Sequence, residues 1–375
     1  AGEGSCRASE PILLIELPTC AGEPILPAFH KDQGGTQMNR RTFLKSTAAA
    51  LLSAPVAGGF SMAQSPTRLR VQLGWIANVE YGDHWLALEN GLFTDAGLDV
   101  TVVPGGPNAP DSLTMVSAHN AEIGYTSWLP FLDAVSKGND FVLIAARMQT
   151  SPLGIISLAK KPILEAKNIV GSRILLQGPA EQTAIEAALS LSGVTGEWSA
   201  VPAGFSPEPL VAGDGDGYTA FATNQTITLE RMGLERDKDF FFRTFEELGF
   251  ASYAGLAFVS RPFLEANRPA LVAYLRALMQ AWIENEKDPM IAPKLVVEKY
   301  GADYGLDIDQ QTRQNELQMP FWRPGGDPNY PLLKLDREKI AGRMYEAARA
   351  TGRTNLPDVE KIIDPSLAEE ALASL

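Results

Sequence analysis

The sequence predicts an α/β fold made of two lobes, and three observations favour it. Short apolar runs alternate with helical patterns along most of the chain, which is typical of a parallel α/β sheet. That alternation is interrupted twice, so two series of elements and two crossings between them are expected. The 375 residues, 45% of them hydrophobic, with a mean hydropathy of −0.06, suit a globular protein of about two domains.

The first series of elements supplies the start of the first lobe, residues 68–150. RLRVQLG is predicted as a strand, and DHWLALENG as a helix that ends at Gly91, because glycine favours the position after a helix. The elements expected next are the strand LDVTVV, the helix PDSLTMVSA, the strand AEIGYT, the helix WLPFLDAVSKG and the strand DFVLIAAR.

The second series supplies the second lobe, residues 153–248, between the interruptions MQTSPLG and ELGFASYAG. Its expected elements are GIISLA, KNIVGSRILLQ, the helix EQTAIEAALSLSG, the strand EWSAVP, the helix SPEPLVAG, the strand DGYTAFA, the helix NQTITLERMG and DFFFRTF. The strand LAFVS and long helices then complete the first lobe over residues 254–375: RPALVAYLRALMQAWIENE, DPMIAPKLVVEKYG and DREKIAGRMYEAARATG. Ligands of such sheets bind beyond the carboxyl ends of the strands, so a cleft between the lobes is the expected site.

An export signal precedes the first predicted strand. NRRTFLK is followed by the apolar, small-residue run STAAALLSAPVAGG, and small residues stand at Ser61 and Ala63. Paired arginines in this context predict a twin-arginine signal peptide over residues 38–63, cleaved after Ala63. The apolar run is too short to span a membrane, which takes about 20 residues. We therefore expect a protein free in the periplasm, without a lipid anchor.

The residues before Met38 are expected not to belong to the fold. Residues 1–37 precede a methionine that would start a normal signal, and we interpret them as a non-native or mis-assigned extension. They contain both cysteines, Cys6 and Cys20. The chain after cleavage would then lack a disulfide, a thiol nucleophile and a cysteine-based metal site.

Charge and motif spacing argue against nucleic-acid and metal binding. The net charge of −13 and the pI of about 4.8 would repel phosphate backbones. His84 and His119 lack the helical spacing of a zinc enzyme. AGDGDG, around Asp214, resembles part of a calcium loop, but Gln225 stands where the loop needs its final glutamate.

Two long stretches resemble the substrate-binding proteins of ABC importers. They are VQLGWIANVEYGDHWLALENGLFTDAGLDVTVVPGG and AEIGYTSWLPFLDAVSKGNDFVLIA, and they are similar to the branch for thiamine-pyrimidine precursors, riboflavin, taurine and alkanesulfonates. The opening pattern of that branch is a strand, Trp-x-x-Asn, a helix, and a glycine-rich turn into the next strand. It is matched here by Trp75, Asn78, Gly91, Phe93, Gly97, Leu98 and Val100.

The resemblance implies a type II periplasmic binding protein, with two α/β lobes, two crossover segments and a ligand cleft between the lobes. Such a protein is a monomer without cofactor or catalysis, and it presents a small molecule to an ABC permease in the inner membrane. One departure concerns the ligand. Pyrimidine binders of this branch often have a proline and a histidine where this chain has Ala77 and Tyr81.

Candidate ligand contacts in the first lobe follow its strands. Trp75 and Trp128 each come after a strand and offer flat faces to an aromatic ligand, although either could instead fill the core. Asn78 has a donor and an acceptor for the edge of a heterocycle, with a turn or cap role as the alternative. Tyr81 and Thr126 complete the predicted contacts on this side.

Candidate contacts in the second lobe lie where strands meet helices. Gln177 and Glu181 belong to LLQGPAEQT, where free backbone N–H groups can bind polar atoms. Thr223 and Asn224 repeat that geometry in YTAFATNQTITLE, and Asn224 is equally suited to capping a helix. Two aromatic residues, Phe205 and Tyr253, are further candidates for the walls of the cleft.

These residues predict a binding protein for a small planar aromatic heterocycle, of the thiamine-pyrimidine precursor or flavin type. A taurine or alkanesulfonate binder of the same fold is one alternative, and it would need several donors at helix N-termini with little stacking. A pyrimidine-synthesising enzyme on the same fold is the alternative from another class. The fungal branch of such enzymes relies on a cysteine cluster and a cofactor lysine, and both the export signal and the placement of the cysteines argue against it.

Overall fold

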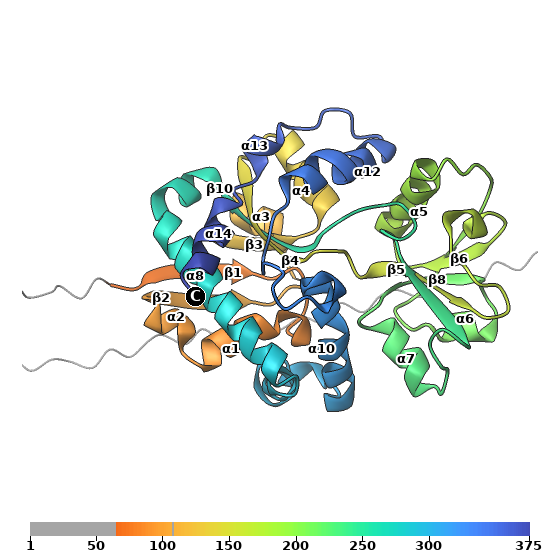
Figure 1. Ribbon diagram of the computed structural model, residues 1–375, viewed down its shortest axis with the longest axis horizontal. Coiled ribbons are helices and arrows are strands. Elements are labelled where there is room, and N and C mark those ends of the chain that lie inside the picture. Colours follow the sequence, from red (N-terminus) through yellow and green to blue (C-terminus); the bar gives the residue numbers. More distant parts are fainter. Residues whose placement is uncertain (1–64, 107–108) are drawn as a thin grey trace, which may run out of the picture. The chain divides into compact units, whose positions relative to one another are not determined.

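Two five-stranded mixed sheets form the framework of the computed structural model, which describes residues 65–106 and 109–375 (Figure 1). The predicted extension and the twin-arginine signal lie outside the described residues. The two sheets belong to a single compact unit, Ala63–Leu375. The two-sheet α/β fold expected from the sequence is confirmed.

The first sheet has the strand order β2-β1-β3-β10-β4. Its strands are β1 (Thr67–Gln72), β2 (Leu98–Val103), β3 (Ile123–Thr126), β4 (Phe141–Met148) and β10 (Ala254–Ser260). β1 pairs in parallel with β2 and β3, whereas β10 runs antiparallel to β3 and β4. All of β4 is buried, as expected for an apolar strand covered on both faces. The carboxyl ends of β1 to β4 therefore share one edge.

The second sheet has the strand order β7-β6-β8-β5-β9. Its strands are β5 (Leu153–Leu158), β6 (Arg173–Leu176), β7 (Ser199–Pro202), β8 (Gly217–Phe221) and β9 (Phe240–Thr244). β6 pairs in parallel with β7 and β8, and β5 runs antiparallel to β8 and β9. β6 to β9 consequently end at one edge, as β1 to β4 do in the first sheet.

One strand in each sheet runs against the others, which corrects the expectation of wholly parallel sheets. These strands, β5 and β10, are the first after each crossing. β5 begins opposite the end of β8, at the pair Leu153 and Phe221, and β10 begins opposite the end of β4, at the pair Ala254 and Met148. Because a short crossing enters the next sheet at the edge that carries the carboxyl ends, the strand that follows must run away from that edge.

Helices cover both sheets, and we call each sheet with its covering helices a lobe. Lobe I is the first sheet with η1 (Val79–Tyr81), α1 (Gly82–Glu89), α2 (Leu92–Asp95), α3 (Ser112–Ser117), α4 (Trp128–Ser136), α8 (Arg261–Lys287), α9 (Ile291–Leu295), η3 (Val296–Tyr300), η4 (Ala302–Tyr304), α10 (Ile308–Trp322), η5 (Pro324–Gly326), α11 (Arg337–Lys339), η6 (Ile340–Met344), α12 (Tyr345–Ala350), α13 (Val359–Ile362) and α14 (Ser366–Ala373). Lobe II is the second sheet with η2 (Ala166–Ile169), α5 (Pro179–Leu191), α6 (Glu208–Ala212) and α7 (Gln225–Arg231). The residue limits of the two lobes given above stay a prediction.

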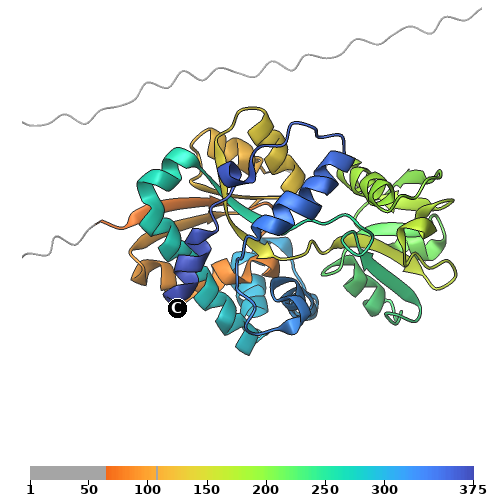
Figure 2. The same ribbon diagram turned by 45° about the horizontal axis from the view of Figure 1, so that its top comes forward.

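The long helix α8 organises the core of lobe I. It packs against α1 and α14, and Figure 2 shows α8 in teal beside α14 in dark blue. Its backbone departs from helical geometry at Asn267, two residues before Pro269, which cannot donate the helical hydrogen bond. Beyond this kink the helix buries an apolar face that includes Leu271, Leu275, Leu278 and Trp282.

Helix α10 is missing from the elements that the sequence predicts. Its buried face consists of amide side chains, Gln311, Gln314, Asn315 and Gln318, and ends at Trp322. A search for apolar residues at helical spacing passes over such a face. Two signals do mark it: Asp307 caps the helix by accepting a hydrogen bond from the Gln310 N–H, and the amides themselves recur at helical spacing.

Candidate functional site

An aromatic pair joins the loops that follow β1 in lobe I and β7 in lobe II. The rings of Trp75 and Phe205 lie with their centroids 6.2 Å apart and their planes at 60°, an edge-to-face arrangement. Trp75 is half-buried against the core of lobe I, and Phe205 is 63% exposed. Two rings from the carboxyl-terminal edges of different sheets therefore meet where the sequence places a ligand.

Backbone contacts hold the segment of Trp75 in place. The Gly105 N–H donates to the Trp75 carbonyl over 2.7 Å. A Cβ atom on Gly105 would lie only 2.4 Å from the Leu73 carbonyl oxygen, so the close approach of these two backbone segments requires glycine.

Asn78 precedes the short helix η1 and caps it. Its side-chain oxygen accepts a hydrogen bond from the Glu80 N–H at 3.0 Å, and its carbonyl accepts from the Trp85 indole at 2.8 Å. The side chain is 7% exposed. This geometry favours the cap alternative for Asn78 over a contact with a ligand edge.

A buried ion pair lies directly behind this segment. Arg147, at the end of β4, donates from Nη2 to Asp83 Oδ1 at 2.7 Å and from Nε to Asp83 Oδ2 at 3.2 Å, and Nη2 also donates to the Glu80 carbonyl. Burial alone would raise the pKa of Asp83, but Arg147 and His84 hold it at about 2. Burial lowers the pKa of His84, although Asp83 opposes that shift. The neutral imidazole bridges Asp83 and the Tyr274 hydroxyl, at 3.0 and 2.8 Å.

Tyr81 belongs to this buried cluster and does not face an open surface. Its side chain is 2% exposed, and its ring lies 4.6 Å from the guanidinium carbon of Arg147. Such a cation–π contact stabilises the buried arginine. The expectation that Tyr81 contacts a ligand directly is therefore not supported by its placement.

Trp128 and Tyr253 also lie in the core, which corrects their expected exposure to a cleft. Trp128 is 1% exposed, stacks with Tyr345 at 5.8 Å, and donates to the Met344 carbonyl at 3.3 Å. Tyr253 is 1% exposed, and its hydroxyl accepts from the Asp336 N–H at 3.0 Å. Both are covered by residues 336–345, which lie far from them in the sequence. Thr126, the last residue of β3, is half-buried.

The lobe II candidates are partly engaged with their own lobe. Gln177 donates to the Thr219 carbonyl at 3.1 Å and accepts from the Thr219 hydroxyl at 2.8 Å, which ties the end of β6 to β8. Glu181 lies half-buried in the first turn of α5. Thr223 is 4% exposed. Asn224 precedes α7 without capping it through its side chain.

Polar contacts between α7 and α10 also connect the two lobes. Arg313 Nε donates to Glu230 Oε2 at 3.1 Å, and Gln310 Nε2 donates to Asn224 Oδ1 at 3.1 Å. Arg231 pairs with Asp307 at 3.0 Å. A pocket of about 330 Å³ lies among these side chains. We call this set of contacts the interlobe latch, and no part of it was expected from the sequence.

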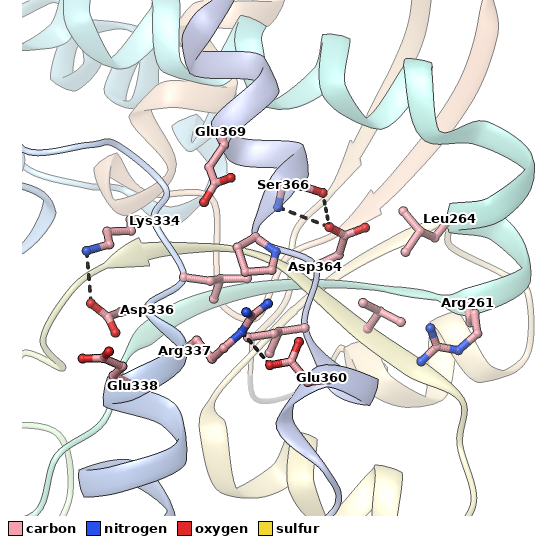
Figure 3. Close-up of a pocket in the computed structure, with 14 residues that line it drawn as sticks. Arg261, Leu264, Lys334, Asp336, Arg337, Glu338, Glu360, Asp364, Ser366 and Glu369 are labelled. Atoms are coloured by element: carbon pink, nitrogen blue, oxygen red, sulfur yellow. Dashed lines mark hydrogen bonds and ion pairs between the residues drawn. The ribbon is translucent and has the colours of Figure 1, made fainter.

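A larger pocket, of about 750 Å³, lies elsewhere, alongside the outer strand β4 (Figure 3). Its lining is strongly charged, and ion pairs join Lys334 to Asp336 and Arg337 to Glu360. Its lining includes neither ring of the aromatic pair and no residue of the interlobe latch, so this pocket is separate from the candidate site. Within residues 65–106 and 109–375, no group of three or more histidine, cysteine or acidic side chains could hold a metal ion.

Comparisons with known proteins agree with this architecture. The family model described as NMT1/THI5 like matches residues 78–292, more than half of the chain. A curated relative, 4-amino-5-hydroxymethyl-2-methylpyrimidine phosphate synthase from Schizosaccharomyces pombe, is 22% identical over 236 residues, which cover 60% of this chain and 68% of the relative.

Solved structures of low sequence identity show the same fold. The periplasmic aliphatic sulphonate binding protein SsuA from Escherichia coli is 15% identical with a TM-score of 0.60, over 80% of this chain and 93% of that one. The periplasmic nitrate-binding protein NrtA from Synechocystis PCC 6803 is 13% identical with a TM-score of 0.57, over 83% and 89%. Among the helices that the structure describes, none has the length and apolar character needed to cross a membrane.

Proposed function

Because the chain belongs to the NMT1/THI5-like family and has the fold of periplasmic binding proteins, we propose that it is the solute-binding protein of an ABC importer. Its ligand is a small planar aromatic heterocycle of the thiamine-pyrimidine precursor or flavin type. The observation that carries this proposal is the pair of aromatic rings, Trp75 and Phe205, that meet from the two lobes.

The geometry of the pair suits insertion of a flat molecule. Stacked rings lie about 3.5–4 Å apart, so a ligand between two parallel rings needs roughly 7–8 Å between them. The present centroid distance is 6.2 Å, and Phe205 is exposed enough to rotate and retreat by the remainder. Each stacked pair adds about 0.5–1.5 kcal/mol beyond the burial of area.

A sulfonate ligand finds less support in the same residues. A sulfonate would be recognised by free N–H groups at helix N-termini. Helix α5 has proline at its first position, Pro179, so that position has no N–H to offer, although its next N–H groups have no side-chain cap. We favour the heterocycle because two aromatic rings from different lobes meet at the candidate site.

The pyrimidine synthase from fission yeast motivates one further candidate, a pyrimidine-synthesising enzyme. The two candidates differ in turnover, because a binding protein releases its ligand unchanged. Incubation of the protein with a pyridoxal cofactor and no added pyrimidine, followed by mass spectrometry of the small molecules, distinguishes them. The absence of any newly formed pyrimidine supports the importer role, and its appearance would support the enzyme.

Calorimetric titration tests the ligand class. The panel consists of 4-amino-5-hydroxymethyl-2-methylpyrimidine, riboflavin and taurine, and the variants are Trp75→Ala and Phe205→Ala. We expect binding of an aromatic compound with one ligand per chain, weakened roughly tenfold or more by either variant, which corresponds to about 1.4 kcal/mol. Trp85→Ala is unsuitable as a control because Trp85 is buried. Leu164→Ala is suitable, since Leu164 is an exposed side chain, 37% accessible, and follows β5, which ends at the edge of the second sheet opposite the candidate site. Binding of taurine alone would overturn the aromatic assignment.

A further inference from the structure

Helix α10 contacts both the second lobe and the segment that carries Trp75. Towards lobe II it presents Gln310 and Arg313, which bond to Asn224 and Glu230. Arg313 also pairs with Glu316 on its own helix, at 3.2 Å. The interlobe latch is thus built on one face of α10.

Another side of α10 forms hydrogen bonds to the backbone of Val79, a residue of the η1 turn. The Val79 N–H donates to Gln311 Oε1 at 2.9 Å, and the Val79 carbonyl accepts from Gln318 Nε2, also at 2.9 Å. Both glutamines are buried, at 3% and 0% exposure. Two side chains about two helical turns apart therefore satisfy both backbone groups of Val79, four residues after Trp75.

A buried amide network fixes these glutamines relative to the rest of the helix. Gln318 Nε2 also donates to Asn315 Oδ1 at 2.8 Å, and Asn315 exchanges two hydrogen bonds of 2.8 and 2.9 Å with Asn285 of α8. Gln311 donates to Gln314 at 3.2 Å. Buried amides without partners are costly, so a shift of α10 moves the turn that its glutamines hold.

The two lobes also contact each other through α12 and α5. This contact is apolar, so it separates less readily than the contact between α7 and α10. Ala347 of α12 is fully buried in the core that contains Ala184, Ile185 and Ala188 of α5. Separation there would expose apolar surface to water, at about 25 cal/mol per Å². The latch, by contrast, consists of half-exposed polar groups that water can solvate. The α7–α10 edge is therefore the one that can part.

We propose that Gln311 and Gln318 are positioning residues, through which contact between α7 and α10 orders the segment from Trp75 to Tyr81. The role of that segment in binding a ligand rests on the proposed function, whereas the coupling does not. When the latch is formed, α10 is held from both sides and the turn is fixed. When the latch is broken, α10 and the turn loosen together.

Hydrogen exchange of the Val79 amide in the unliganded protein tests this coupling. Arg313→Ala and Glu230→Ala remove the principal ion pair of the latch and touch no residue of the turn. Each is expected to speed exchange at Val79 roughly two- to fivefold, the range that a partly exposed ion pair provides. The double variant is expected to add little to either single change, because each single change already removes the same ion pair.

A matched control and a contrary result make the test decisive. Glu235→Ala removes an exposed ion pair with Lys238 that lies wholly within lobe II, and it should leave Val79 exchange unchanged. If Gln311→Ala speeds exchange at Val79 but both latch variants leave it at the wild-type rate, the glutamines hold the turn without sensing lobe contact, and the proposal is wrong. The exchange measurement needs no ligand. If none of the compounds in the calorimetric titration binds, the result for Val79 is unaffected, and an unchanged exchange rate at Val79 would not affect the proposed function.

Discussion

Replacing Trp128 by alanine tests how the two tryptophans after strands differ. Trp128 is 1% exposed, and it packs against Phe131 and Tyr345 at centroid distances of 6.3 and 5.8 Å. Truncation of a buried tryptophan costs about 3–5 kcal/mol, and the loss of its hydrogen bond leaves the Met344 carbonyl without that donor. We therefore expect Trp128→Ala to lower the free energy of unfolding by about 4 kcal/mol.

Thermal unfolding followed by circular dichroism measures this loss. Unfolding entropy is about 2.1 cal/mol/K per residue, so for roughly 310 folded residues about 4 kcal/mol corresponds to a fall in Tm of about 6 °C. Trp75→Ala is the matched variant, and its half-buried side chain should cost no more than about 1–2 °C. If Trp128→Ala left the Tm unchanged while Trp75→Ala lowered it by several degrees, the division between core and site residues would be refuted.

Four further outcomes are expected from the structure. The pKa of Asp83, about 2, lies below its usual value, so the stability from its ion pair is present above about pH 4 and lost as pH falls towards 2. The free energy of unfolding, measured against pH, should fall by on the order of 2 kcal/mol over this range. Asp83→Asn should not show this fall. The lowered pKa of His84 acts in the same direction, with stability falling as pH drops below about 6.5. Gly105→Ala should destabilise by about 1–3 kcal/mol in denaturant titration, because its Cβ would meet backbone at 2.4 Å, whereas Gly204→Ala meets nothing within 4 Å and should be neutral. Salt should widen the protein in small-angle scattering by screening the interlobe latch, and the latch double variant should lose this response.

The regular elements were largely accessible to sequence reasoning. Apolar and β-branched residues specify the strands so strongly that the predicted strand LDVTVV has the limits observed for β2. The reversed strands β5 and β10 were not predicted, because an apolar run has no direction and only the positions of the crossings determine which way it runs.

The candidate site could be predicted only in part from the sequence, because long-range packing decides which side chains are exposed. Trp75 and Trp128 both follow a strand, and local sequence does not separate them. Trp128 is buried by the neighbourhood of Met344, 216 positions away. Phe205 is left exposed on a loop, and its meeting with Trp75 depends on how the two lobes contact each other.

The polar helix α10 shows a different limit. Its core-facing side is made of amides whose partners are backbone groups and other amides, so hydrophobic periodicity carries no signal there. A glutamine and asparagine stripe at helical spacing after a capping aspartate is the pattern that would have revealed it. Because α10 was not predicted from the sequence, the interlobe latch was not predicted either.

The central claim is that a flat ligand lies between Trp75 and Phe205, and a crystal structure of the protein purified with its natural ligand tests it most directly. The account predicts planar electron density between the two rings, with the ring planes turned towards parallel. Density for the ligand in the charged pocket of Figure 3, or anywhere that leaves the Trp75–Phe205 contact undisturbed, would contradict it.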